Sequence, residues 1–161
     1  MSADDGEPGL RLDAYLPYRL SVASNAVSGL IARAYQDRFG LTIPQWRLVC
    51  VLAEDGRMTQ GQIVTRTFMD KVTVSRAAQG LAGRHLVDRS DNHADGRSHV
   101  LMLTPEGRRL FAEVAPLALA YEAALISGLA PEDVMLLRRL LGRLQSAATA
   151  LVGEGEPPPI G

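Results

Sequence analysis

Residues 59–83, TQGQIVTRTFMDKVTVSRAAQGLAG, decide the fold because they encode two short helices separated by a tight turn. Thr59 and Gln62 have the spacing of a capping box, which predicts a helix through about Thr67. Asp70 is the next N-cap candidate. The helix after it has an apolar face and a polar face. The apolar positions are Val74, Ala77, Ala78 and Leu81, and the polar face carries Lys71, Thr73, Arg76, Gln79 and Gly83. This pattern predicts a helix-turn-helix.

A β-hairpin is expected directly after this motif. Residues 86–89 and 100–103 have the composition of short strands, and the polar loop between them contains Asp95-Gly96, which suits a turn. Thr104, Pro105 and Glu106 then supply an N-cap, a proline in the first turn and an acid near the positive end of a helix. A helix-turn-helix followed by a hairpin predicts a winged helix, so the fold class is mainly α with a small β wing.

Long helices are predicted on both sides of this lobe. A single helix is expected from Leu12 to Arg38, followed by a loop with Gly40 and Pro44 and a short helix over residues 45–53. The helix that opens at Thr104 contains Pro116, which is expected to kink it near residue 112. A last helix opens at Pro131. The first and last helices carry apolar residues at heptad-like spacing: Leu16, Leu20, Ala23, Val27, Leu30 and Ala34, then Val134, Leu137, Leu141, Leu144, Ala148 and Leu151.

The two apolar seams could pack on each other within one chain or against a second copy, and we favour dimerisation. The predicted organisation has three parts: a helical dimerisation region at residues 10–40 and 105–152, a winged lobe at 41–104, and flexible tails at 1–9 and 153–161.

Composition narrows the class of protein. With 161 residues and 47% hydrophobic residues, the chain is long and apolar enough for one packed domain. Its longest uncharged run, Leu20 to Ala32, has 13 residues, fewer than the roughly 18 that a membrane span needs. The acidic N-terminus does not have the order of a signal peptide, and the single Cys50 cannot form an internal disulfide. A cytoplasmic protein without membrane contact is therefore expected.

Charge is unevenly distributed along the chain. Residues 57–109 hold nine basic and five acidic residues, a net +4, whereas the rest holds eight basic and thirteen acidic residues, a net −5. Lys71 is the one lysine among 17 cations. A positive centre suits a polyanionic partner, and arginine suits phosphates and guanine edges.

These elements resemble the MarR family of bacterial transcriptional regulators. The likeness is carried by Asp70-Lys-Val-Thr-Val-Ser-Arg76, Leu86-Val87, Asp95-Gly-Arg-Ser98 and Leu103-Thr-Pro-Glu-Gly-Arg-Arg-Leu110. It implies a homodimer whose two winged lobes grip a pseudo-palindromic operator in double-stranded DNA, in many members as a repressor released by a small ligand that is often aromatic or phenolic. His85 departs from the glycine that the family often has there, so either His85 takes a left-handed conformation or the helix ends at Gly83.

Candidate DNA contacts follow from this placement. On the second helix, Arg76 suits a guanine, Gln79 an adenine, and Lys71, Thr73 and Ser75 suit phosphates or base edges. In the wing, Arg97 is expected to enter a minor groove while Asp95 holds its guanidinium. Arg89, His93 and Ser98 are expected near phosphates. The alternative for all of them is an ordinary solvated surface.

An effector pocket is expected between the first two helices, the helix after Thr104 and the winged lobe. Its candidate residues are Tyr15, Arg19, Asn25, Trp46 and Arg47, of which Arg19 or Arg47 could pair with an anionic ligand. For each residue taken singly, the favoured interpretation is simpler: Trp46 belongs to the core and the arginines make pairs within the chain.

Other chemistries find little support in the sequence. Cys50 lies in an apolar run, which favours a core thiol over an oxidation sensor. His85, His93 and His99 do not have the spacing of a zinc site, no cofactor loop occurs, and no catalytic motif is found. A non-enzyme is expected. Besides a DNA-binding regulator, a winged-helix protein-interaction module remains open; it would expose apolar anchors on the second helix, for which only Val72 qualifies.

Overall fold

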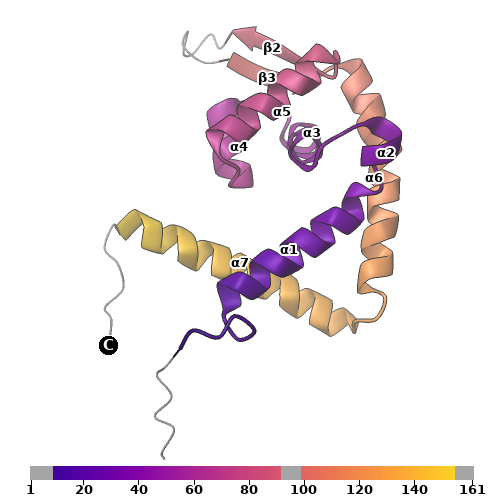
Figure 1. The fold of residues 1–161 in the computed structure, drawn as a ribbon. Helices are drawn as coiled ribbons and strands as arrows, with labels where there is room; N and C mark the ends of the chain where they lie inside the picture. The colour runs from indigo at the N-terminus through magenta and orange to yellow at the C-terminus, as the bar shows by residue number, and fades with distance from the viewer. Residues whose placement is uncertain (1–8, 92–98, 155–161) are drawn as a thin grey trace, which may run out of the picture. The chain divides into compact units, whose positions relative to one another are not determined.

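The computed structural model describes residues 9–91 and 99–154. These residues form seven helices and three strands, in the order shown in Figure 1. Their bounds are α1 Leu16–Ala32, α2 Gln36–Phe39, α3 Ile43–Asp55, β1 Met58–Thr59, α4 Gln60–Thr67, α5 Lys71–Gly83, β2 Val87–Asp91, β3 His99–Leu103, α6 Pro105–Ile126 and α7 Pro131–Glu154.

The chain divides into two compact units, Met1–Tyr121 and Glu122–Gly161. The first holds everything from α1 through most of α6, including the sheet, and the second holds the end of α6 and α7. In the second unit Arg138 on α7 pairs with Glu122 at 3.3 Å. The predicted tails lie mostly outside the described residues, and the predicted division into a dimerisation region and a winged lobe stays a prediction.

The helix-turn-helix and the wing form as predicted. Thr59 accepts the N–H of Gln62 at 3.2 Å and the Gln62 side chain accepts the N–H of Thr59 at 2.8 Å, so the capping box of α4 is confirmed. The sheet is antiparallel with strand order β1-β3-β2, and its hairpin pairs Val87 with Leu103 and Asp91 with His99. Strand β2 begins one residue and ends two residues later than predicted, and β3 begins one residue earlier.

The single helix predicted from Leu12 to Arg38 is wrong at both ends. The helix begins at Leu16, with Pro17 in its first turn, and ends at Ala32. The chain then turns, forms the four-residue α2 and stops at Gly40, whose φ of 62° is left-handed. Tyr35 is buried at this break. In a continuous helix, the helical period alone would have decided which way its side chain faced.

The start of α3 is also corrected. We predicted Pro44 in a loop and a helix from Gln45, but α3 begins at Ile43 with Pro44 in its first turn. Thr42 caps it, because its hydroxyl accepts the N–H of Gln45 at 3.3 Å while the Gln45 side chain accepts the N–H of Thr42 at 2.9 Å. Proline is tolerated there, since the first N–H groups of a helix have no partner inside it.

The core of the first unit surrounds α3, which packs against α4, α5 and β3 (Figure 1). Trp46 stacks between Tyr35, at 5.4 Å between ring centroids, and Phe111 of α6, at 5.8 Å. The fully buried side chains come from every element around α3: Tyr35, Leu41, Leu48, Val49, Ile63, Val74, Leu81, Leu101 and Val114.

Candidate nucleic-acid interface

Asp70 fixes the start of α5. Its carboxylate accepts the backbone N–H of Thr73 at 2.8 Å and the Thr73 hydroxyl at 2.6 Å, which confirms Asp70 as the N-cap. These hydrogen bonds from Thr73 lower the pKa of Asp70. Thr73 was predicted to contact DNA, but its hydroxyl proton is committed to Asp70 and the side chain is half-buried. In this arrangement Thr73 orders the first turn of α5 and is left only as a hydrogen-bond acceptor.

The face of α5 opposite to its buried residues is exposed. Lys71, Arg76 and Gln79 are exposed, while Ser75 is half-buried and its hydroxyl accepts from the Gln79 amide at 3.4 Å. Among the described residues, no acidic side chain lies within ion-pair distance of Lys71 or Arg76. Because both cations are exposed and unneutralised, they suit contact with a polyanion.

Val72 shares this face, although the sequence predicts it only as an anchor for a protein partner. Its side chain is 57% exposed, and Arg76 and Gln79 lie four and seven residues further along the helix. That spacing places all three on one stripe. An exposed aliphatic residue beside two hydrogen-bonding residues suits a base pair that carries a thymine methyl group. The signal available in the sequence was the period of the helix, which puts Val72 on the polar face.

The base of the wing is described, but most of its predicted contact residues are not. His93, Asp95, Arg97 and Ser98 lie outside the described residues. Arg89 on β2 is exposed, and its place near phosphates stays a prediction. Arg57, which precedes β1, donates to the Ser90 hydroxyl on β2 at 3.3 Å. Since β3 lies between β1 and β2, this bond ties together the two outer strands of the sheet.

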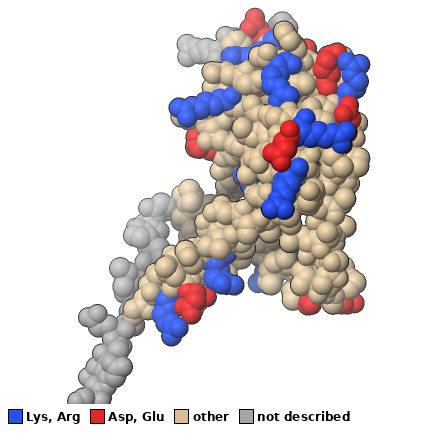
Figure 2. Space-filling model, turned by 45° about the vertical axis from the view of Figure 1, so that its right-hand side comes forward, with Lys and Arg blue, Asp and Glu red and all other residues tan. Residues whose placement is uncertain are grey.

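On the face drawn in Figure 2, Lys and Arg side chains lie on the upper part of the molecule and also lower down, and acidic side chains are interleaved among them. Along the sequence, residues 57–109 carry a net charge of +4.

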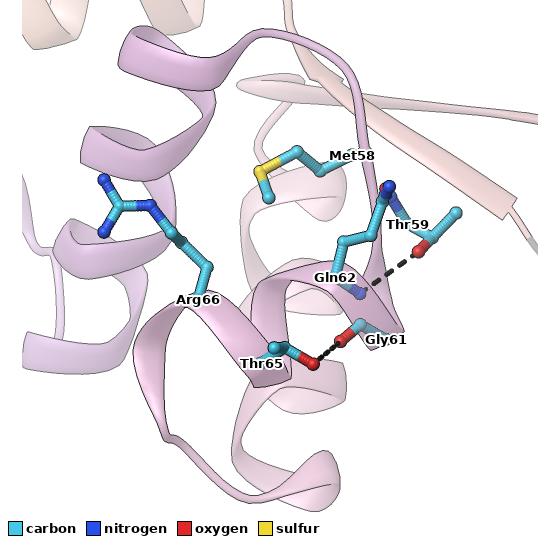
Figure 3. A pocket seen from close by; sticks show the side chains of 6 residues that line it. All are labelled: Met58, Thr59, Gly61, Gln62, Thr65 and Arg66. Carbon is cyan, nitrogen blue, oxygen red and sulfur yellow. Dashed lines mark hydrogen bonds between the residues drawn. The ribbon is translucent and has the colours of Figure 1, made fainter. Parts of the chain in front are cut away.

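A surface depression of about 470 Å³ lies beside α4 (Figure 3). Its polar lining is already engaged within the chain. Thr59 and Gln62 cap each other, Thr65 donates to the carbonyl of Gly61 at 3.2 Å, and Arg66 pairs with Glu54 and Asp55. Because these groups already have partners, the depression offers little to orient a ligand.

The residues predicted for an effector pocket are not brought together by hydrogen bonds or ion pairs among the described residues. Trp46 is buried in the core, and Arg47 donates to the Ser28 hydroxyl on α1 at 3.2 Å. Tyr15, Arg19 and Asn25 are exposed on or next to α1. Arg47 is close enough to Tyr35 to oppose the rise in the Tyr35 pKa that burial causes. One cation therefore lies near the aromatic stack.

Cys50 has the character expected of a core thiol. It packs against the core from α3, and burial, assisted by the nearby Glu54 carboxylate, raises its pKa to about 12. The thiolate is the reactive form, so this environment makes the sulfur inert.

We therefore expect Cys50 to react slowly with Ellman's reagent in the folded protein. A pKa of about 12, against an ordinary value of 9.0, leaves about a thousandfold less thiolate at neutral pH. The measurement compares the labelling rate in buffer with the rate in denaturing urea. Equal rates in the two conditions would show that the thiol is accessible and ionises normally.

Two further classes of site find no support in the part of the chain that the structure describes. Within residues 9–91 and 99–154, no three His, Cys, Asp or Glu side chains are grouped as a metal site requires. No single described helix has both the length and the apolarity to cross a bilayer; α6 and α7 meet that test only when taken together across the break between them.

The arrangement defines a winged helix-turn-helix: α4 and α5 form the helix pair, and β2 and β3 form the hairpin that follows them in the chain. A model of the MarR family matches residues 39–98, which include α4, α5 and β2 and end just before β3. A solved MarR family transcriptional regulator from Silicibacter pomeroyi DSS is 30% identical and superposes with a TM-score of 0.75 over 93% of this chain and 99% of its own. The chain belongs to the MarR family of transcriptional regulators, which are not enzymes.

Two further relatives agree with this assignment. BpsR of Bordetella bronchiseptica, whose DNA binding is regulated by 6-hydroxynicotinic acid, is 27% identical, with a TM-score of 0.74 over 81% of this chain and 98% of its own. The HTH-type transcriptional regulator YwoH of Bacillus subtilis, itself uncharacterized, is 28% identical over 74% of this chain and 89% of its own.

Proposed function

We propose that this protein is a dimeric repressor that places α5 in the major groove of an operator. It dissociates from the operator when a small aromatic acid binds. The observation that carries the DNA-reading part is the free face of α5. Lys71, Val72, Arg76 and Gln79 are exposed on a helix whose first turn is fixed by Asp70 and whose other face is buried. Such a face offers a cation, an aliphatic group and two bidentate hydrogen-bonding groups to base edges and phosphates.

Dimerisation is supported by apolar surface that one chain leaves exposed. On α1, the exposed side chains include Leu16, Leu20 and Val27; on α7 they include Leu137 and Leu141, each at least 37% exposed. These are seam positions predicted from the sequence. Apolar surface of this extent on long helices is typical of a protein–protein contact. A twofold dimer would present two copies of α5 to a pseudo-palindromic operator.

Ligand release is supported by a relative and by one local feature. BpsR responds to 6-hydroxynicotinic acid, an aromatic carboxylic acid. In this chain Arg47 lies near Tyr35, which stacks with Trp46 and through it with Phe111, so a cation and aromatic rings lie in one neighbourhood. An aromatic carboxylate suits both, through an ion pair and ring stacking. Tyr15, directly before α1, and Arg19 and Asn25 on α1 remain proposed pocket residues.

The test is fluorescence anisotropy with the duplex upstream of the protein's own gene against a scrambled duplex, at about 150 mM salt because affinity depends on salt. Tight binding to the first duplex alone supports a sequence-specific regulator. The same complex is then titrated with 6-hydroxynicotinate and benzoate as probes. A fall in anisotropy supports ligand release, and an unchanged signal with both probes contradicts an aromatic acid of this kind.

The second candidate, a winged-helix protein-interaction module, is favoured by one observation. Phe68, at the end of α4, is 64% exposed, and Val72, near the start of α5, is 57% exposed. Two exposed apolar side chains around the turn could anchor a protein partner. Equal, weak and salt-sensitive binding to every duplex, including those selected from a random pool, would favour this function over the repressor.

A further inference from the structure

Arg84 joins the end of α5 to a distant part of the chain. It directly follows the last residue of α5, and its guanidinium donates to the carbonyl of Phe39 at 2.8 Å and to that of Gly40 at 3.2 Å. Gly40 and Phe39 precede Arg84 by 44 and 45 positions in the sequence. The bonds therefore fix α5 relative to the end of α2.

The carbonyls at the end of α2 are suited to this contact. The last carbonyls of a helix have no partner inside it, and Gly40 ends α2 in a left-handed conformation with a φ of 62°. The guanidinium is a planar fork whose two outer nitrogens can reach two neighbouring acceptors at once. Arg84 thus satisfies two acceptors with one rigid group.

The chain that leaves α5 is held at the same point by a second contact. His85 takes the left-handed conformation, with a φ of 57°, and its carbonyl accepts the Thr104 hydroxyl at 2.8 Å. The carbonyl of Leu86 accepts the N–H of Thr104 at 3.1 Å. These bonds tie the exit from α5 to the start of α6. The hydrogen bonds of Arg84 tie the same exit from α5 to the end of α2.

We propose that Arg84 is a positioning residue for DNA recognition: in addition to the packing of α5 on α3, it fixes the end of α5 against α2, and operator specificity depends on this. The inference rests on the proposed reading of DNA by α5. Asp70 orders the first turn of α5 from within its own segment, so it cannot fix where the helix lies in the lobe. A helix that shifts by a fraction of an ångström keeps its phosphate contacts more easily than its bidentate base contacts, whose geometry is strict.

The test compares Arg84→Ala with the wild-type protein on the best duplex selected from a random pool and on a scrambled duplex. We expect Arg84→Ala to bind the selected duplex about tenfold more weakly, from the loss of charged hydrogen bonds, with little change on the scrambled one. The dependence of affinity on salt should stay the same. Loss on both duplexes, with a salt slope lower by about 0.9, would mean that Arg84 contacts a phosphate directly and would overturn the proposal.

Arg109→Ala is the matched control, because it also removes one exposed cation but, within residues 9–91 and 99–154, breaks only the local pair of Arg109 with Glu106 on α6. It is expected to leave the ratio of the two affinities unchanged. Should Arg84→Ala not fold, Arg84→Lys takes its place, since lysine keeps the charge but not the planar fork. For Arg84→Lys, the ratio of the affinities for the selected and scrambled duplexes is expected to lie between that of the wild type and that of a protein that no longer distinguishes the two duplexes.

The outcomes separate this proposal from the proposed function. A wild-type protein that selects no duplex from the pool overturns both. A wild-type protein that does select one, together with an Arg84 variant that folds and keeps the full ratio, overturns only the positioning role.

Discussion

An Arg76→Ala variant is expected to bind the operator about 5- to 150-fold more weakly than the wild-type protein, a loss of about 1–3 kcal/mol. Arg76 is exposed on α5 and, among the described residues, has no acidic partner, so its guanidinium is free to make a bidentate contact with guanine. The variant should also distinguish less between bases at the contacted position. Anisotropy titrations against single-base operator variants measure both effects.

Two variants serve as controls for Arg76→Ala. Arg76→Lys keeps the charge but loses the planar fork, so most of the specificity should disappear while the salt dependence remains. Arg66→Ala removes a cation from α4 that is already paired with Glu54 and Asp55, and it should bind nearly as tightly as the wild type. If Arg76→Ala binds every duplex as tightly as the wild type does, α5 does not read DNA through Arg76.

Gly107→Ala is expected to lower the free energy of unfolding by about 3 kcal/mol. Gly107 is buried in the first turns of α6, and a Cβ there would overlap the carbonyl oxygen of Leu86 and lie 3.2 Å from the Leu103 side chain. The obstacle is backbone, which cannot rotate away. The whole start of α6 would have to move off the hairpin, and the bonds of Thr104 to His85 and Leu86 would be strained with it.

Urea unfolding measures this effect, and Gly83→Ala is its control. Gly83 is the last residue of α5, with no atom within 4 Å of a Cβ placed on it, and its φ is not left-handed. Alanine there should stabilise the protein by up to about 1 kcal/mol, because it restricts the unfolded chain. If the two alanine variants were equally stable, the close approach of α6 to the hairpin would not exist in solution.

Local signals in the sequence were enough to predict the helix-turn-helix. Three helix starts are marked by interactions within three or four residues: at Thr59 with Gln62, at Asp70, and at Thr104 with Pro105. Such signals do not depend on the rest of the fold. The polar face of α5 followed from the period of the helix, which is why Arg76 and Gln79 could be placed correctly on its exposed side.

Features that depend on distant residues could not be predicted. The break after Ala32 follows from the burial of Tyr35 against Trp46, and the pattern of apolar residues continued through it. The contact of Arg84 with Phe39 and Gly40 joins segments whose approach is decided only when the lobe packs. The pocket residues were placed by resemblance, and nothing local in the sequence separates a ligand arginine from one that bonds Ser28, as Arg47 does.

The position of Trp46 gives this protein an optical probe of its own. It is the one tryptophan in the chain, and its ring lies between a tyrosine that precedes α2 and a phenylalanine of α6. Light absorbed by Tyr35 at this separation passes efficiently to Trp46, so the indole emits for both. Its emission therefore responds to a change in the packing of three segments of the chain, without any attached dye.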